Sequence, residues 1–177
     1  IYLQAQHVTL PQDITDFLFF FVHSWADWVA NHHILEEELM FPGFERVMGN
    51  SMSLERNMEQ HHIFQPVLQE ILAYSAETRP VDYQVAVLQH LIEAMAPSFH
   101  QHLRQEIMNL VAMETFNGPA LLKVYKSCEA EAGKQNKYVV PPMVLGLRDV
   151  TFEGGKFGNI SDLGAFFHAT FGESLIH

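Results

Sequence analysis

The stretch His32-His33-Ile34-Leu35-Glu36-Glu37-Glu38-Leu39-Met40-Phe41-Pro42 places two imidazoles one helical turn before two carboxylates. Residues i and i+4 of an α-helix lie on the same face. His32 and Glu36 therefore point the same way, and His33 and Glu37 form a second pair about 100° further round. Because imidazole and carboxylate together suit Fe, Mn or Zn, the stretch predicts part of a metal site on a helix.

A second copy of this spacing lies at His102-Leu103-Arg104-Gln105-Glu106, and the pair His61-His62 lies between the two copies. A single His-x-x-x-Glu is weak evidence, because exposed i,i+4 pairs are common on helices. Two copies that continue apolar helix faces, with a histidine pair between them, indicate metal binding. The alternative is a polar core whose groups satisfy one another without a metal.

On both sides of this stretch, apolar residues recur at steps of three and four. This spacing predicts an all-α protein with the architecture of an up-and-down helical bundle. Its short connections imply antiparallel neighbours. The first expected helix runs from Gln12 to Phe41, and Pro42 and Gly43 close it before a loop over 43–52. The second begins after a cap at Ser51 or Ser53 and runs to about Ala76, and the third runs from about Val81 to Met113, kinked or split at Pro97. The fourth runs from Asn117-Gly118-Pro119 to about Lys134.

The two ends of the chain follow a different pattern. Residues 1–8 are typical of the tail of a helix, which Thr9-Leu10-Pro11 ends. From Tyr138 the helical spacing stops, and prolines and glycines predict an irregular tail with a short helix near Asp162–Thr170. We therefore expect a helical bundle over residues 1–135 and a C-terminal extension packed on it over 136–177.

The apolar neighbours of each candidate ligand indicate which side chains face inward. Met40 follows Glu36 by four residues and Leu110 follows Glu106 by four, which favours His32 and Glu36 over His33 and Glu37 as the inward pair. His33 and Glu37 then lie behind the ligands or at a solvated edge that orients them.

His61 is favoured over His62 because Phe64 and Leu68 share its side of the helix. The histidines at positions 23, 90 and 100 are expected to be structural or exposed. The candidate metal ligands are therefore His32, Glu36, His61, His102 and Glu106.

Composition narrows the function classes. The chain has 177 residues, 48% of them hydrophobic, and a formal net charge of -11. This charge disfavours nucleic acid and anionic membranes as partners, although an ordinary acidic cytosolic protein would also carry it. The single Cys128 allows no internal disulfide and favours a reducing, cytoplasmic location. The apolar run Phe17–Val22 is too short to span a bilayer, and fits either bundle core or a homo-oligomer contact.

Three stretches carry a family resemblance: His32-His33-x-x-Glu36-Glu37-x-x-Met40-Phe41-Pro42, Glu59-Gln60-His61 and His102-Leu103-x-x-Glu106. Taken together, they resemble the hemerythrin-like (HHE cation-binding) domains. The opening residues 1–5 and Thr151-Phe152-Glu153-Gly154-Gly155 are most similar to fungal members. The resemblance implies a four-helix bundle that holds two irons bridged by carboxylates.

The resemblance also implies roles for the candidate ligands. Glu36 and Glu106 would bridge the irons, His32 would bind one iron, and His61 and His102 the other. Two family histidines have no counterpart here: one comes from a first helix that is represented only by residues 1–8, with His7 at its far end, and the other is replaced by Asn57. A mononuclear or empty site is therefore the alternative to a di-iron site.

Three functional hypotheses follow. The first is a non-haem iron protein that binds or senses O2, NO or iron, and is not an enzyme because no candidate nucleophile is present. The second is a ferritin-like di-iron oxidase, which needs two Glu-x-x-His motifs; Glu59-x-x-His62 is one match, without a second on a partner helix. The third is a metal-free bundle with a structural or interaction role.

Overall fold

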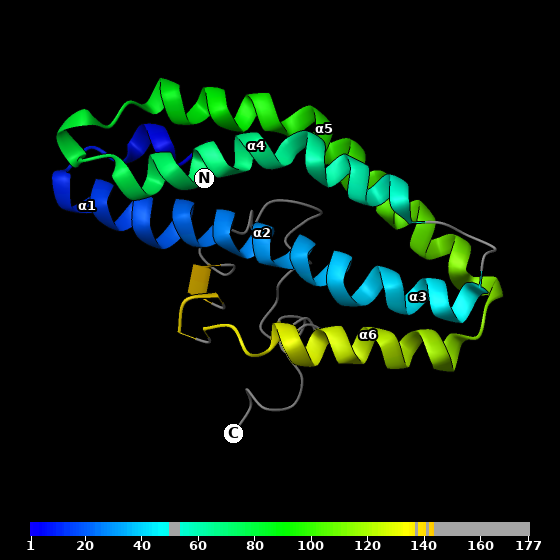
Figure 1. Cartoon of the computed structure of the whole chain (residues 1–177). Helices are drawn as coiled ribbons and strands as arrows, with labels where there is room; N and C mark the ends of the chain where they lie inside the picture. The colour runs from blue at the N-terminus through cyan, green and yellow to red at the C-terminus, as the bar shows by residue number, and fades with distance from the viewer. Residues whose placement is uncertain (50–53, 137, 141, 144–177) are drawn as a thin grey trace, which may run out of the picture.

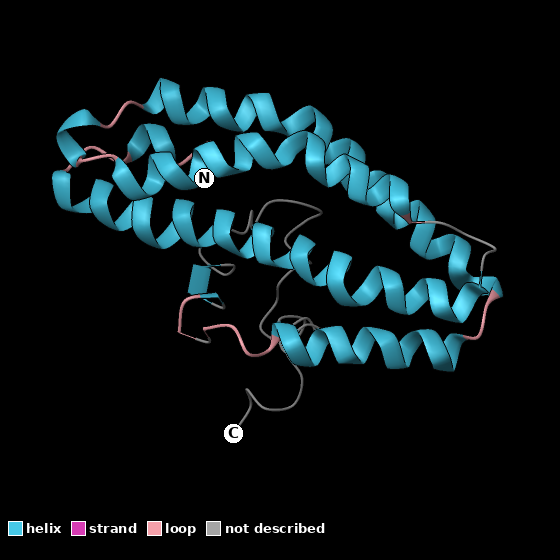
Figure 2. Ribbon diagram, viewed as in Figure 1, coloured by secondary structure: helices cyan, strands magenta, loops and turns pink. Residues whose placement is uncertain are grey.

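The computed structural model describes residues 1–49, 54–136, 138–140 and 142–143, and in this part of the chain the regular structure is entirely helical (Figures 1 and 2). The all-α prediction is confirmed. The long helical stretches are α1 (Pro11–Asp16), α2 (Ser24–Leu35), α3 (Phe41–Met48), α4 (Glu55–Glu77), α5 (Val85–Ala112) and α6 (Gly118–Ala132).

The first three of these helices form one continuous rod. α1 passes through the π-helical segment Phe17–His23 into α2, and α2 passes through a second π-helical segment, Glu36–Met40, into α3. Each residue at these joins keeps right-handed helical backbone angles. The rod ends at Gly49, whose φ of 66° is readily adopted by glycine.

The expectation that Pro42 and Gly43 close this helix is wrong. Pro42 lies in the first turn of α3, and residues 43–48 are helical where a loop was expected. Proline lacks an N–H and clashes with the preceding turn. The wider π-helical turn just before Pro42, in which the Phe41 N–H donates to the Glu36 carbonyl, accommodates that clash.

Gly43 serves helix packing instead of ending a helix. A Cβ built at position 43 would collide with the side chain of Val124 in α6. The absence of a side chain therefore lets α3 and α6 approach each other closely.

We expect Gly43→Ala to lower the free energy of unfolding by about 1–2 kcal/mol, because the cost of overpacking exceeds the helix propensity gained. Thermal unfolding followed by circular dichroism measures this change. Gly118→Ala is the matched control, since a Cβ there meets nothing within 4 Å. Adding Val124→Ala should recover most of the loss, and a Gly43→Ala variant as stable as wild type would contradict this packing role.

α4 and α5 form an antiparallel pair joined by the short 3₁₀ turn Pro80–Asp82. α5 runs unbroken from Val85 to Ala112, so Pro97 does not split it, and it begins four residues later than expected. α6 begins where Asn117-Gly118-Pro119 predicted: the Asn117 side chain accepts the Ala120 N–H as an N-cap, and Pro119 follows in the first turn.

Two apolar clusters flank the middle of the rod. The larger lies between the rod and the α4–α5 pair, and its fully buried members include Leu18, Val22, Phe64, Leu68, Ile71, Leu88 and Met95. The smaller joins the C-terminal end of the rod to α6, through Met40, Phe41, Phe44, Met48, Met113 and Cys128. α6 thus packs on the rod on the side away from α4 and α5 (Figure 1).

The chain start is a short 3₁₀ turn, Ala5–His7, where the tail of a helix was expected. It packs across α5: the Tyr2 hydroxyl hydrogen-bonds Glu93, and the Tyr83 hydroxyl donates to the Ala5 carbonyl at 2.9 Å. His7 is exposed at this end of the molecule.

Only the first part of the C-terminal extension lies within the described residues. Val140 and Met143 are buried against Phe20, Trp25 and Trp28 of the rod. The short helix expected near Asp162–Thr170 falls outside the described residues. In the Phe17–Val22 run, Phe19 is 68% exposed while Phe17, Leu18 and Val22 are buried, so most of the run is core. The division at residue 135 stays a prediction.

Candidate metal centre

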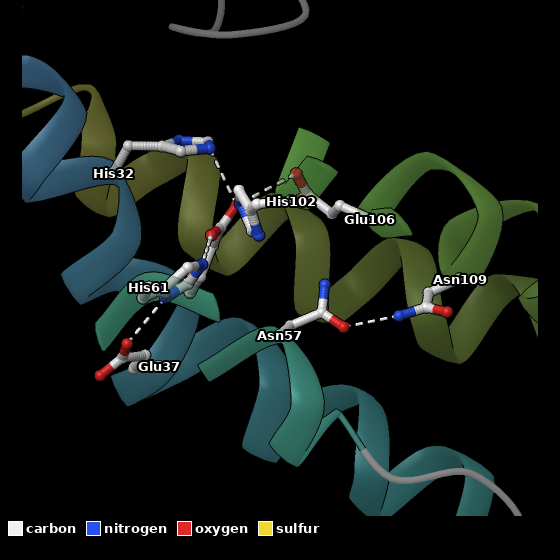
Figure 3. Close-up of polar contacts among 8 residues, drawn as sticks. His32, Glu37, Asn57, His61, His102, Glu106 and Asn109 are labelled. Carbon is white, nitrogen blue, oxygen red and sulfur yellow. Dashed lines mark hydrogen bonds and ion pairs between the residues drawn. The ribbon is translucent and has the colours of Figure 1, made fainter. Parts of the chain in front are cut away.

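Six titratable side chains from three helical elements converge between the two apolar clusters. Figure 3 labels four of them, His32, His61, His102 and Glu106. The rod contributes three of them, α4 one and α5 two. In chain order they are His32, His33, Glu36, His61, His102 and Glu106. The five predicted ligands are therefore brought together, and His33 joins them.

The inner group combines three imidazoles and one carboxylate, all buried. Its members are His33, Glu36, His61 and His102, and each offers one ligand atom within 4.8 Å of the others. The His61 ring centroid lies 4.3 Å from that of His33 and 4.5 Å from that of His102. Three close nitrogen donors around one carboxylate form a donor set for a transition metal ion.

The outer group, His32, Glu36 and Glu106, shares its central carboxylate with the inner group. His32 Nε2 lies 2.8 Å from Glu36 Oε1, whereas His61 Nε2 lies 3.3 Å from Glu36 Oε2. Each carboxylate oxygen of Glu36 thus faces a different group. Glu36 stands where a carboxylate could bridge two neighbouring ions.

The expectation that His33 lies behind the ligands or at a solvated edge is wrong. His33 is 6% exposed and central, whereas the His32 side chain is 46% exposed. The inward face differs from the expected one at this position, because His33 lies on it with Glu36 and Met40 in place of His32. Its buried members alternate at steps of three and four: Ala26, Val29, His33, Glu36 and Met40. That alternation was the sequence signal that could have identified His33.

Apolar and aromatic side chains wall the inner group. The Phe64 ring centroid lies 4.9 Å from that of His33 and 5.5 Å from that of His102, and Phe41 stacks on His61 at 5.8 Å. Such walls exclude water and strengthen the electrostatic interactions inside.

The two carboxyl groups of the centre favour opposite protonation states. Burial opposes ionisation of Glu36, but its contacts with His32 and His61 outweigh burial and hold its pKa well below the ordinary value. Burial, together with the negative charge of Glu36, raises the pKa of Glu106 to about 8. At neutral pH the metal-free centre therefore has an ionised Glu36 beside a protonated Glu106.

Two of the inner imidazoles are held neutral. Burial lowers the pKa of His33 to about 3 and that of His102 to about 4, and the neighbouring His61 lowers both further. Because a metal binds neutral imidazole, these two rings need lose no proton when an ion enters.

Glu37 orients His61 from outside the group, as expected for the residue beside the ligands. Its Oε1 lies 2.7 Å from His61 Nδ1. A carboxylate accepts, so Nδ1 carries a proton and donates, and Nε2 is the ring nitrogen that faces Glu36 and the centre. A carboxylate behind a histidine fixes the ring and raises its basicity as a ligand.

We expect Glu37→Leu to weaken metal binding by about 10- to 100-fold, because the His61 ring loses the partner that sets its orientation and tautomer. Glu37→Gln keeps an oxygen acceptor without the charge, and should lose less. Competition titration against a chelator of known affinity measures both. Glu38→Gln, an exposed neighbour, is the matched control. Equal affinities for wild type and Glu37→Leu would show that His61 needs no such support.

Several buried ligand atoms of the centre, which are carboxylate oxygens and imidazole nitrogens, make no aligned hydrogen bonds in the part of the chain that the structure describes. Their hydrogen-bonding state indicates whether the centre suits a cation. Within the described residues, both carboxylate oxygens of Glu36, Nε2 of His61 and both ring nitrogens of His102 make no aligned hydrogen bond, although the Glu36 oxygens lie close to His32 and His61. Buried polar atoms without partners are costly. Because these atoms converge and form a nitrogen–oxygen donor set, the residues fit a bound iron, manganese or zinc ion.

The remaining predicted features lie outside the centre. Glu59 and His62, the match to the ferritin-like motif, are both exposed on α4. His90 and His100 are also exposed, as expected, and His23 is half-buried with Nδ1 3.1 Å from the Ser75 hydroxyl.

A model of the hemerythrin HHE cation-binding domain matches residues 4–113, more than half of the 177 residues. The chain belongs to the hemerythrin HHE family. The resemblance carried by His32, Glu36, His61, His102 and Glu106 is therefore confirmed at the level of the family. That these five bind the metal in this HHE domain remains a prediction.

Among curated proteins, this HHE chain is similar to "Dimeric xanthone biosynthesis cluster protein R11" from the fungus Cryptosporiopsis sp. (strain 8999). The two are 27% identical over 157 residues, which cover 88% of this chain and 60% of the relative. The chain thus spans about 60% of the length of that relative. No solved structure matches the present chain. Within the described residues, no helix is long and apolar enough to cross a bilayer.

Proposed function

We propose that this chain is a non-haem iron protein that holds iron at two adjacent positions sharing Glu36, and that it binds or senses a small ligand such as O2 or NO there. The observation that carries the proposal is the convergence of buried nitrogen and oxygen atoms of Glu36, His61 and His102 that make no aligned hydrogen bond within the described residues. Family membership supports a cation at this place. Bound iron would supply an electron-rich centre with coordination positions for a diatomic ligand.

A cavity of about 70 Å³ beside the inner group supports a ligand of this size. It lies between α2 and α4, and its lining includes His33, Glu37, His61, Phe64 and Leu68. The residues of the chain thus leave room for a small ligand, such as a diatomic molecule, next to His33 and His61.

Metal analysis with a visible spectrum tests the proposal. The protein is loaded anaerobically with Fe(II), oxidised, analysed for iron per chain, and then titrated with azide. Close to two irons per chain and a new absorption band with azide are the expected results. One iron per chain would support the mononuclear alternative. No iron after loading would overturn the proposal and favour the metal-free bundle.

The relative named for a dimeric xanthone biosynthesis cluster suggests a second function, a part in the biosynthesis of such a metabolite. If this function holds, the described site would bind a small co-substrate such as O2. Oxygen uptake by the Fe(II)-loaded protein, with and without a xanthone, separates the two functions.

We also propose a cytoplasmic location and a homo-oligomer contact for this protein. The free thiol of Cys128 is consistent with a cytoplasmic location. The exposed Phe19, within an otherwise buried apolar run, is the residue around which a homo-oligomer contact would form. Sedimentation of wild type and Phe19→Ser at the same concentration would measure such a contact.

A further inference from the structure

Three side-chain amides form a chain that ends beside the metal centre. Gln105 Nε2 donates to Asn109 Oδ1 at 3.1 Å, and Asn109 Nδ2 donates to Asn57 Oδ1 at 2.5 Å. Asn57 is 0% exposed, and its Nδ2 has no hydrogen-bond partner within the described residues. A buried N–H donor without a partner is costly, so its retention calls for an explanation.

The direction of this chain determines what Asn57 offers. An amide has one oxygen that accepts and one NH2 group that donates. Gln105 occupies the oxygen of Asn109, so Asn109 presents its NH2 to Asn57, and Asn57 is left with a free NH2 group.

The position of Asn57 directs this NH2 group toward the centre. Asn57 lies one turn before His61 on α4, and Asn109 lies one turn after Glu106 on α5. The amide pair is therefore the layer of the bundle next to the ligands. Figure 3 shows the nitrogen of Asn57 pointing to the side of His102 and Glu106, and its oxygen turned toward Asn109.

We propose that Asn57 Nδ2 donates a hydrogen bond to a small ligand bound at the metal centre on the side of His102 and Glu106, outside the cavity that His33 and His61 line, and so sets the affinity for acceptor ligands such as azide or O2. This inference rests on the proposed function. A ligand that gains negative charge on binding is stabilised by a fixed N–H donor in a site walled from water. Asn109 is a positioning residue, because it acts by holding the Asn57 amide in this direction.

Azide titration of the Fe(III)-loaded protein, followed by visible absorbance, tests the inference with Asn57→Leu. We expect unchanged iron per chain and a dissociation constant for azide raised about 10- to 100-fold, the range for losing a hydrogen bond to a charged group. Asn109→Leu should raise the constant less, in the same direction. Ser75→Ala, a buried polar site on α4 far from the centre, should leave it unchanged.

The outcomes separate this inference from the proposed function. A wild-type protein that takes up no iron would overturn the proposed function, and the inference with it. Normal iron content with unchanged azide affinity in Asn57→Leu would overturn the inference alone. Loss of iron in Asn57→Leu would make Asn57 a ligand or a purely structural residue, which also overturns it. If the leucine variant does not fold by circular dichroism, Asn57→Ser gives the same test.

Discussion

Glu36→Gln is expected to remove metal from both positions, leaving less than about a tenth of the wild-type iron per chain. Glu36 is the one member common to the two groups of donors, with Oε1 facing His32 and Oε2 facing His61. An amide has a single oxygen and no charge, so it cannot serve two cations. Loss of a residue behind a ligand costs about 10- to 100-fold in metal affinity, and loss of a shared ligand should exceed that.

Elemental analysis after anaerobic Fe(II) loading and gel filtration measures this loss. Glu38→Gln is the matched control, because it removes one carboxylate two residues away from an exposed position. Circular dichroism of both variants establishes that the helices remain. Glu36→Gln with wild-type iron content would mean that the metal, if present, lies elsewhere in the chain.

The sequence predicted Glu36 because a carboxylate on an apolar helix face needs a partner. The same reasoning placed His61, His102 and Glu106 near it, and the structure brings all four together. The beginning of α6 was equally predictable, since Asn117 and Pro119 act locally, as N-cap and first-turn residue. These features depend on residue spacing and local chemistry, both of which can be recognised in the sequence before the fold is known.

His33 and Pro42 were misjudged for different reasons. Pairing Glu36 with the residue four positions before it selected His32, although steps of three and four from Ala26 to Met40 place His33 on the buried face. Pro42 was treated as the end of a helix. The rod instead contains a π-helical turn over Glu36–Met40, which rotates the residues that follow and accommodates the proline. Such a turn depends on tertiary packing around it, and its position is not encoded in residue spacing.

The packing role of Gly43 could not be predicted from the sequence, for a different reason. A glycine next to a proline is typical of a helix end, and only the position of Val124 in a distant helix shows that Gly43 allows close packing. The Asn57–Asn109 hydrogen bond likewise joins residues 52 apart in the chain. Contacts of this kind follow from how α4 meets α5, which the sequence specifies only through the whole fold.

Glu106→Gln is expected to reduce the iron content from two ions to one per chain, with the inner ion retained. Glu106 belongs only to the outer group, while His33, Glu36, His61 and His102 are untouched by the change. The converse variant, His33→Leu, should weaken the inner ion and leave the outer donors in place. Glu114→Gln, an exposed carboxylate further along the chain, is the matched control.

The pH dependence of iron uptake supplies an independent check on the same residue. Because the pKa of Glu106 is raised to about 8, its carboxyl must lose a proton before it can bind the outer ion. His32 adds to this dependence: burial opposes its charged form, but the contact with Glu36 raises its pKa, so this ring must also lose a proton to bind the outer ion. Affinity for that ion should therefore rise by at least about tenfold per pH unit up to about pH 8. His33 and His102, with pKa values of about 3 and 4, are already neutral in this range, so proton loss from these two rings adds no such rise to binding of the inner ion. Retention of two ions by Glu106→Gln, with the wild-type pH dependence, would show that Glu106 is not a ligand and that the outer group binds its metal without it.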